Sequence, residues 1–393
     1  MSAEYVPRCR SSPELATQFL ASLSSNLILL LLSVYLFPVV LSGVQVTAYL
    51  VSVLAQARLS QTATPTASSN QQTSAWLLFT RKPTKSLTFW IFPALLVVFG
   101  SILYSVSDNT IGSIQAPFPS ALDHTYDSTN NSRFDIVISM YTESPESVKT
   151  MIESLKTTSF LQTITPNVIV YTKDPHANLE LLKSSTGADT IYQLENLGRE
   201  GGTYLHHIVS KWDNLAEQTL FIQAHAHNIR ELLPRINDYL VAGTGMLSLG
   251  FTGVTCDCNS CTDRWGWEDK WEVIPRLYEK IYDKTCDDNT QVLMSYKGQF
   301  VASGRRIRGI SKAIYEDLLA AIASRDGWSH DAHYVIGPDS GDNPYFGFTV
   351  ERIWGLLMQC TDLRVAYRCP SLLSGMGRAG KVEDCQCLDD VRE

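Results

Sequence analysis

From Arg133 onward, short runs of β-branched and aromatic residues alternate with stretches of helical periodicity. This pattern predicts helices over 145–157, 178–185 and 202–212, the first with Ser144 as its N-cap and Pro145 at its first position. Buried strands are predicted around them, over 134–139, 167–171, 190–194 and 219–223. Strands that alternate with helices form a mostly parallel sheet with helices on both faces. We therefore expect an α/β domain.

The loops that follow these strands are the expected place for a site, because ligands of such sheets bind beyond the carboxyl ends of the strands. The loops are 141–143, 196–203 and 223–228. The last contains His225 and His227, which are either ordinary loop polarity or a metal ligand or proton-transfer group. The sequence has no Walker loop, no GxSxG elbow and no HExxH, and no DxD pair ends the fourth strand.

One loop combines glycines with two charged side chains. Glycines at 198, 201 and 202 precede a helix, an arrangement that suits an anion or a carboxylate. Arg199 and Glu200 project from this loop, and we expect both to bind substrate. Glu351, in a helix predicted to start near residue 342, is either part of the catalytic wall or half of an internal ion pair.

Two other charged clusters are candidates for binding. A dense basic cluster is either a solvated face or a phosphate site, and it consists of Arg305, Arg306 and Arg308. Between Trp265 and Glu272, carboxylates alternate with tryptophans, which suits a flat or cationic group or, equally, a surface hairpin held by aromatic packing. The carboxylates are Glu268, Asp269 and Glu272.

The amino-terminal third has a different composition. No charged residue occurs from Leu15 to Ala57. A helix that crosses a bilayer needs ~20 apolar residues. We therefore predict transmembrane segments over 26–55 and 87–106, and the remaining divisions are an N-terminal tail (1–25), polar linkers (56–86 and 107–132) and a catalytic domain (133–393).

The charges around these spans leave the orientation open. The 56–86 linker has more basic residues than the N-terminal tail, so the positive-inside rule puts the linker in the cytosol and the catalytic domain in the lumen. A hairpin within the first apolar run would reverse this. Asn130 begins a glycosylation sequon, which is compatible with a lumenal side. We expect an endomembrane location, with the side of the domain undecided.

Cysteine and charge content narrow the partners. The chain has nine cysteines, and three of them form a CxCxxC group at 256–261 that is a weak zinc signal, so no metal site is predicted. Disulfides between this group and the CxC at 385–387 are expected if the domain is lumenal, and less so if it is cytosolic. The net charge of −8 argues against non-specific binding to nucleic acid, and no DNA partner is expected.

Four segments resemble a fungal domain family long described as of unknown function. They are ENLGREGGTYLHHIV (195–209), GQFVASGRRI (298–307), DNPYFGFTVERIW (342–354) and CQCLD (385–389). The resemblance covers 134–387, about two thirds of the chain. Some members of that family are arginine-containing cyclodipeptide synthases, and the family's fold is similar to that of GT-A glycosyltransferases.

The resemblance implies an enzyme that condenses arginyl-tRNA with a second aminoacyl-tRNA and releases a cyclo(Arg-Xaa) diketopiperazine, a secondary-metabolite scaffold, without a cofactor. The synthases have an Asp-Asp-x-x-Glu motif that is important for activity. It matches Asp389, Asp390 and Glu393, which are the implied catalytic residues. The carboxylates of 268–272 would then pair with the arginine side chain, and the basic cluster would contact the tRNA acceptor phosphates.

Two other functions fit the sequence. The main alternative is a membrane-anchored glycosyltransferase that uses a nucleotide sugar, with a divalent metal at His225 and His227 or near Asp257 in place of the missing DxD. The third is a lectin-like or adaptor domain without activity. The charged residues in the predicted strand-end loops make this third function the least attractive.

Overall fold

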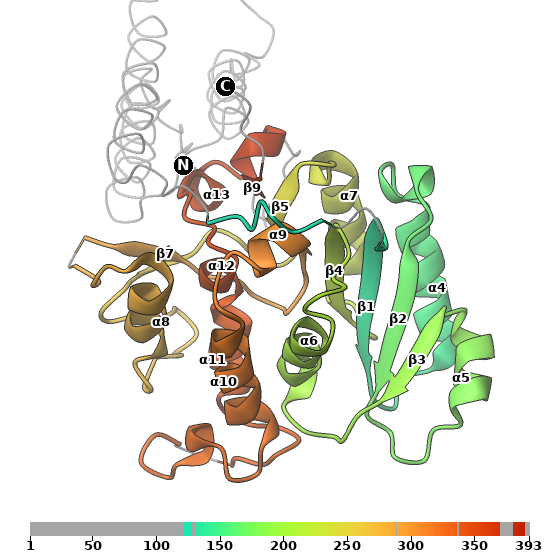
Figure 1. Cartoon of the computed structure of the whole chain (residues 1–393), viewed down its shortest axis with the longest axis horizontal. Coiled ribbons are helices and arrows are strands. Elements are labelled where there is room, and N and C mark those ends of the chain that lie inside the picture. Colours follow the sequence, from blue (N-terminus) through green and yellow to red (C-terminus); the bar gives the residue numbers. More distant parts are fainter. Residues whose placement is uncertain (1–120, 128–130, 288, 336–337, 370–379, 390–393) are drawn as a thin grey trace, which may run out of the picture. The chain divides into compact units, whose positions relative to one another are not determined.

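A seven-stranded sheet forms the centre of the domain, in the order β3-β2-β1-β4-β8-β5-β9 (Figure 1). The computed structural model describes residues 121–127, 131–287, 289–335, 338–369 and 380–389. The strands of the sheet are β1 (Phe134–Met140), β2 (Asn167–Thr172), β3 (Thr190–Gln193), β4 (Gln218–Gln223), β5 (Thr244–Ser248), β8 (Phe300–Ser303) and β9 (Cys387–Leu388). A separate two-stranded ribbon consists of β6 (Thr255–Asp257) and β7 (Gln291–Leu293).

The sheet is mixed. β1 pairs in parallel with both β2 and β4, and β2 pairs in parallel with β3. β8 is antiparallel to its neighbours β4 and β5, and β9 is antiparallel to β5. Only β8 and β9 therefore run against the other strands of this sheet. Every residue of β1 is buried, as expected for a strand that is covered on both faces.

Helices cover both faces of the sheet and create two cores. In the first, alternate residues of β1 pack with α4 (Pro145–Lys156), α5 (Leu179–Thr186) and α7 (Ile229–Tyr239). In the second, Val137 and Tyr171 pack with α6 (Arg199–Ser210) and α10 (Lys312–Ala323), which lie side by side (Figure 1). The shorter helices are α8 (Val273–Tyr282), α9 (Gly304–Ile307), α11 (Gly347–Arg352), α12 (Trp354–Leu357) and α13 (Arg364–Tyr367), and the 3₁₀ turns are η2 (Leu161–Thr163), η3 (Trp328–His330) and η4 (Val382–Asp384).

The predicted order of strands and helices between 134 and 223 is confirmed, including Ser144 as N-cap and Pro145 at the start of α4. Two helix starts were predicted wrongly. α6 begins at Arg199, three residues before the predicted start, because Gly198 adopts a left-handed conformation (φ 70°) and caps it. The helix expected near residue 342 begins at Gly347.

The predicted transmembrane segments, 26–55 and 87–106, lie outside the described residues, as do most of the 107–132 linker and Asn130. Within the ranges that the structure describes, we find no helix of the length and apolarity that a membrane crossing requires.

The cysteine pairing differs from the prediction. The described residues form four disulfides, Cys256–Cys261, Cys258–Cys286, Cys360–Cys387 and Cys369–Cys385. None joins the 256–261 group to the tail. The ribbon β6–β7 and α8 bring Cys286 to Cys258, whereas β9 lies at the far edge of the sheet beside β5.

A buried histidine in α6 should make the domain sensitive to acid. His207 is fully buried and its Nδ1 lies 3.0 Å from the hydroxyl of Tyr171. Burial, with a smaller contribution from the charge of Lys211, lowers the pKa of His207 to about 3 from 6.5. The unfolded chain therefore binds an extra proton between pH 6.5 and 3, and stability is lost as the pH falls through this window.

We expect His207→Phe to flatten the pH dependence of unfolding in this window, by up to about 1.4 kcal/mol per pH unit. Urea unfolding at several pH values measures the slope. Wild type and variant curves that run parallel from pH 6.5 to 3 would contradict the prediction.

Candidate functional site

Glu200 lies where α6 begins, at the carboxyl edge of the sheet. Its side chain is 15% exposed and lies 3.7 Å from the guanidinium Nε of Arg199. The turn before β8 packs directly against the Glu200 side chain. A β-carbon placed on Gly298 of this turn would lie 3.2 Å from Glu200 Cγ and 3.5 Å from Gln223 Nε2. Gln223 is the last residue of β4, so this turn, the start of α6 and the end of β4 meet at one place.

The antiparallel pairing of β8 explains this meeting. Phe300, the first residue of β8, pairs with Phe221 near the end of β4. The turn that leads into β8 therefore projects beyond the carboxyl end of β4. Its residues Lys297 and Gly298 both have positive φ (74° and 56°), and the Tyr204 hydroxyl donates to the Gly298 carbonyl at 3.0 Å.

Lys173 holds the 197–199 loop against the end of β2. Its ammonium donates to the carbonyl oxygens of Leu197 and Arg199. Burial lowers the pKa of Lys173 to about 8, although the nearby charge of Glu200 raises it. On the other side of the loop, the Gly198 amide donates to the Gly341 carbonyl at 2.7 Å. The backbone that positions Glu200 is thus bonded on two sides.

A second carboxylate and several basic groups complete this cluster. Glu351 of α11 accepts a hydrogen bond of 2.6 Å from the Lys297 amide through Oε1. The His227 amide donates to the side chain of Gln299 at 2.5 Å. Burial, followed by the charge of Lys297, lowers the pKa of His227. We call Lys173, Arg199, Glu200, His227, Lys297 and Glu351 the rim cluster.

A buried ion pair between Arg352 and Asp263 lies next to the rim cluster. Arg352 Nη2 lies 2.7 Å from Asp263 Oδ2, and these side chains are 7% and 0% exposed. Burial would raise the pKa of Asp263, but the hydrogen bond from Arg352 holds it below the ordinary value. Arg352 follows Glu351 directly, so the pair anchors the end of α11 that presents Glu351 to the rim.

Three of the predicted binding residues meet in the rim cluster: Arg199, Glu200 and Glu351. The glycines near them do not form an open cradle. Gly201 and Gly202 lie in the first turn of α6, where a Cβ on Gly201 would come within 2.9 Å of the Val350 side chain. Because Gly201 has no side chain, α6 can pack closely against Val350 of α11.

The carboxylates of Glu268, Asp269 and Glu272 lie in the loop before α8. Among the described residues, we find no contact between them and the rim cluster. Asp269 accepts a 2.7 Å hydrogen bond from the Ile274 amide, so it caps α8. Burial raises the pKa of Asp269. Glu268 and Glu272 are exposed, and the adjacent Trp267 and Trp271 are buried in the core. Their proposed role in binding arginine stays a prediction.

The basic cluster lies at the opposite edge of the sheet, because α9 follows β8 and Ser303 pairs with Gln218 at the amino end of β4. Arg306 is 2% exposed and donates to the carbonyl oxygens of Met358 and Leu388, both at 3.0 Å. Arg306 is therefore held by contacts inside the domain, and its predicted contact with phosphate stays a prediction.

Arg308 is also committed to the structure. It pairs with Asp123 at 2.9 Å and stacks on the rings of Tyr126 and Trp212. Arg305 is exposed, at the same edge. The three arginines therefore do not form one phosphate site near the rim cluster.

Asp389, the one described member of the predicted Asp-Asp-x-x-Glu motif, also lies at this opposite edge. Leu388 pairs with Thr244 at the start of β5, and Asp389 Oδ1 receives a 2.9 Å hydrogen bond from Arg306 Nε. Figure 1 shows α9 and β9 in the upper part of the view and the loop after α10 at the lower end. Asp390 and Glu393 lie outside the described residues.

Sequence reasoning missed Lys173 and Lys297. Lys173 lies two residues after the predicted strand 167–171 and directly after the observed β2, so the rule that pointed to the other strand-end loops would have found it. Lys297 precedes a strand, and only the reversed direction of β8 brings it to this edge.

The described residues contain no group of three or more histidine, cysteine, aspartate or glutamate side chains arranged to hold a metal ion. His225 and His227, considered above as metal ligands, are both exposed and gain no third ligand of this kind. Within the described ranges, the residues considered for the divalent metal of the glycosyltransferase alternative form no complete set of protein ligands.

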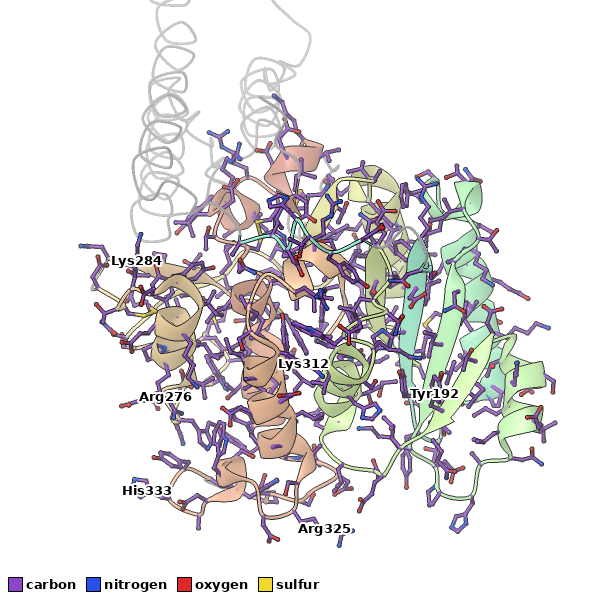
Figure 2. All side chains as sticks on the ribbon, viewed as in Figure 1. Tyr192, Arg276, Lys284, Lys312, Arg325 and His333 are labelled. Atoms are coloured by element: carbon purple, nitrogen blue, oxygen red, sulfur yellow. A yellow bond between two sulfur atoms is a disulfide. The ribbon has the colours of Figure 1, made fainter. Side chains whose placement is uncertain are left out.

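A cavity of about 740 Å³ borders the loop that carries Arg199. Its lining includes His330 and Asp339, whose side chains are hydrogen-bonded at 2.6 Å, but no member of the rim cluster. Its lining residues are Asn196, Leu197, Arg325, His330, Ala332, Val335, Asp339, Ser340, Gly341 and Asp342. Figure 2 shows Arg325 at the lower end of the domain, beyond α10.

Comparison with known proteins identifies a family and a set of distant structures. A family model described as "Protein of unknown function (DUF3431)" matches residues 154–374. No curated protein matches the chain. A 4-diphosphocytidyl-2C-methyl-D-erythritol synthase shows 9% identity and a TM-score of 0.24, with 58% of this chain and 99% of that chain covered.

Two glycosyl-transfer enzymes are also among the matching structures. The glucosyl-3-phosphoglycerate synthase of Mycobacterium tuberculosis, in complex with UDP, shows 11% identity and a TM-score of 0.26, over 52% of this chain and 70% of that chain. The mannosyltransferase PcManGT of Pyrobaculum calidifontis, with GDP-Man and Mn²⁺, shows 11% identity and a TM-score of 0.25, over 56% and 59%. Similarity this low carries no argument about activity.

Proposed function

This chain belongs to the family described as "Protein of unknown function (DUF3431)", and from that premise we propose that it is a glycosyltransferase that uses a nucleotide sugar. The reaction would take place at the rim cluster. The amino-terminal spans predicted from the sequence would anchor the enzyme in an endomembrane, with the catalytic domain in the lumen.

The disulfides are the observation that carries this choice. All eight cysteines of the described domain are paired. Disulfides persist in oxidising compartments and are rare in the cytosol. Nucleotide sugars are available in the lumen of secretory compartments, whereas charged tRNAs are cytosolic. The pairing therefore supports the nucleotide-sugar donor over the aminoacyl-tRNA donor.

The rim cluster can supply the chemistry of sugar transfer. A hydroxyl of the acceptor attacks the anomeric carbon as the bond from that carbon to the diphosphate oxygen breaks. The carboxylate of Glu200 accepts the hydroxyl proton, and the nucleoside diphosphate leaves with the electron pair of the broken bond. Arg199 and Lys297 face the negative charge that develops on this leaving group.

A second function, the tRNA-dependent cyclodipeptide synthase, is favoured by one specific observation. Three of the four segments that carry the resemblance contribute to the same place: 195–209 contributes Glu200, 298–307 contributes Gly298, and 342–354 contributes Glu351. Two carboxylates at one rim suit an ammonium or a guanidinium group. In this reaction Glu200 would accept the proton of the attacking α-amine.

Donor specificity separates the two functions. We expect the purified full chain, in detergent and with its disulfides intact, to release nucleoside diphosphate from a UDP- or GDP-hexose and to leave arginyl-tRNA intact. Chromatography of nucleotides and mass spectrometry of cyclo(Arg-Xaa) are the two readouts. Formation of cyclo(Arg-Xaa) from arginyl-tRNA and a second aminoacyl-tRNA, without hexose turnover, would establish the second function instead.

The lumenal location gives an independent prediction. If the domain is lumenal, Asn130 carries a glycan, and endoglycosidase treatment of the protein from a eukaryotic host should increase its gel mobility. Asn130→Gln should abolish the shift. A protein whose mobility does not change, and whose cysteines react with maleimide without prior reduction, would contradict a lumenal domain.

A further inference from the structure

An exposed tryptophan and an exposed arginine follow β6 and pack on two less exposed rings, Phe251 before β6 and Tyr296 after β7. Trp265 is 53% exposed, and its ring packs at 4.9 Å on Tyr296 and at 5.8 Å on Phe251. The Arg264 guanidinium lies over the rings of Phe251 and Trp265, at 4.8 and 4.4 Å. We call Phe251, Arg264, Trp265 and Tyr296 the aromatic platform.

The platform is held rigidly from beneath. Asp263 Oδ1 accepts hydrogen bonds from the amides of Trp265 and Trp267, at 2.8 and 3.1 Å. Its other oxygen accepts from Arg352 and from the Tyr296 hydroxyl, the latter at 3.3 Å. Because the Asp263 side chain is fully buried, an exposed tryptophan stands on a fixed support. Ordering such a side chain in advance reduces the entropy cost of binding.

The platform is continuous with the rim cluster. Tyr296 precedes Lys297, whose amide bonds to Glu351, and Gly298, which packs against Glu200. The same Arg352 that bonds Asp263 under Trp265 also lies 3.8 Å from Glu351. The support of Trp265 and the rim cluster therefore share Arg352 and the turn that contains Tyr296, Lys297 and Gly298.

We propose that the aromatic platform is the acceptor subsite of the transferase and binds a pyranose ring of a glycan acceptor. The proposal rests on the function proposed above. The indole of Trp265 is 53% exposed, so it offers an apolar face to the C–H groups on one side of a sugar ring. Arg264 makes no ion pair within the described ranges, so its N–H groups can donate to hydroxyls of the same sugar.

Binding is tested first without any donor. Calorimetric titration of the full chain with mannotriose, cellotriose and chitotriose should reveal binding of at least one of these trisaccharides. Trp265→Ala should weaken that binding about 10-fold or more, and Trp265→Phe should restore most of it, since an aromatic face is retained. Binding of the trisaccharide by Trp265→Ala at wild-type affinity, or no binding of any of the three, would overturn the subsite.

Tyr192 provides the matched control. It is 38% exposed on β3, with Lys211 over its ring at 5.3 Å, and it lies across the view from Arg276 of α8 (Figure 2). Like Trp265→Ala, Tyr192→Ala removes an exposed ring that a cation covers, but on the other side of the domain. It should leave trisaccharide binding unchanged, and an equal loss in both variants would overturn the assignment to the platform.

Kinetics distinguish the subsite from the proposed function. With a nucleotide sugar as donor, Trp265→Ala should raise the KM for the trisaccharide about 10-fold and leave hydrolysis of the donor in its absence unchanged. If no nucleotide sugar is turned over but Trp265→Ala still abolishes trisaccharide binding, the proposed function fails and the platform stands as a glycan-binding site. A fall in donor hydrolysis equal to the fall in transfer would overturn an acceptor-specific role.

Discussion

We expect Glu200→Gln to lower the rate of group transfer by about 10²–10⁴-fold, the range by which a positioned general base accelerates a reaction. The amide has the same shape as the carboxylate but cannot accept the proton of the acceptor hydroxyl. The backbone around residue 200 should persist, because Lys173 and the Gly341 carbonyl hold the loop through main-chain groups. The measurement is kcat for hexose transfer, with the melting temperature of the variant recorded beside it.

The matched control is Glu180→Gln, in the first turn of α5 and exposed. It removes one negative charge from the start of a helix, as Glu200→Gln does, and should keep wild-type kcat. Wild-type kcat in Glu200→Gln would exclude this residue as the base. The variant tests the rim cluster for either proposed reaction, because Glu200 accepts the proton in both.

We expect Asp389→Ala to destabilise the domain by about 3–5 kcal/mol, the usual cost of removing one partner of a buried ion pair. Arg306, which is 2% exposed, would remain buried and lose its 2.9 Å hydrogen-bonded ion pair with Asp389. The melting temperature should fall by roughly 6–15 °C for a domain of this size. The activity of the protein that remains folded should be retained, because Asp389 lies at the edge of the sheet opposite to Glu200.

The exposed ion pair of Asp213 with Arg308 serves as the comparison. Asp213 is 84% exposed at 3.3 Å from Arg308, so Asp213→Ala should cost about 0–1 kcal/mol. If instead Asp389→Ala abolishes activity and melts at the wild-type temperature, the catalytic role implied by the Asp-Asp-x-x-Glu motif is correct and the structural role is wrong.

The strand and helix order up to β4 could be predicted because each element there has a local signal. β1 is a continuous apolar run, α4 begins with Ser144 and Pro145, and the strands alternate with helices in chain order. The position of Arg199 and Glu200 at the carboxyl edge of the sheet followed from one rule about where parallel strands end. Their place in the rim cluster agrees with that rule.

The second half of the sheet could not be predicted in this way. β8 and β9 are inserted against the direction of the other strands, next to partners far away in the sequence. This insertion sends Arg306 to one edge and Lys297 to the other, although only nine positions separate them in the chain. The disulfide partners depend on the same long-range arrangement, because the spacing of cysteines does not determine their connectivity.

The sequence by itself determined the α/β class, the order of elements from 134 to 223 and the loop that presents Glu200, since these depend on hydrophobic periodicity, caps and strand ends that are read from neighbouring residues. Only the tertiary structure decided that Glu200, Glu351 and Lys297 share one rim and that Arg306 and Asp389 form a buried pair away from it. The reason is physical: burial and pairing of a charge depend on which distant segments pack around it, and local patterns contain no information about that packing.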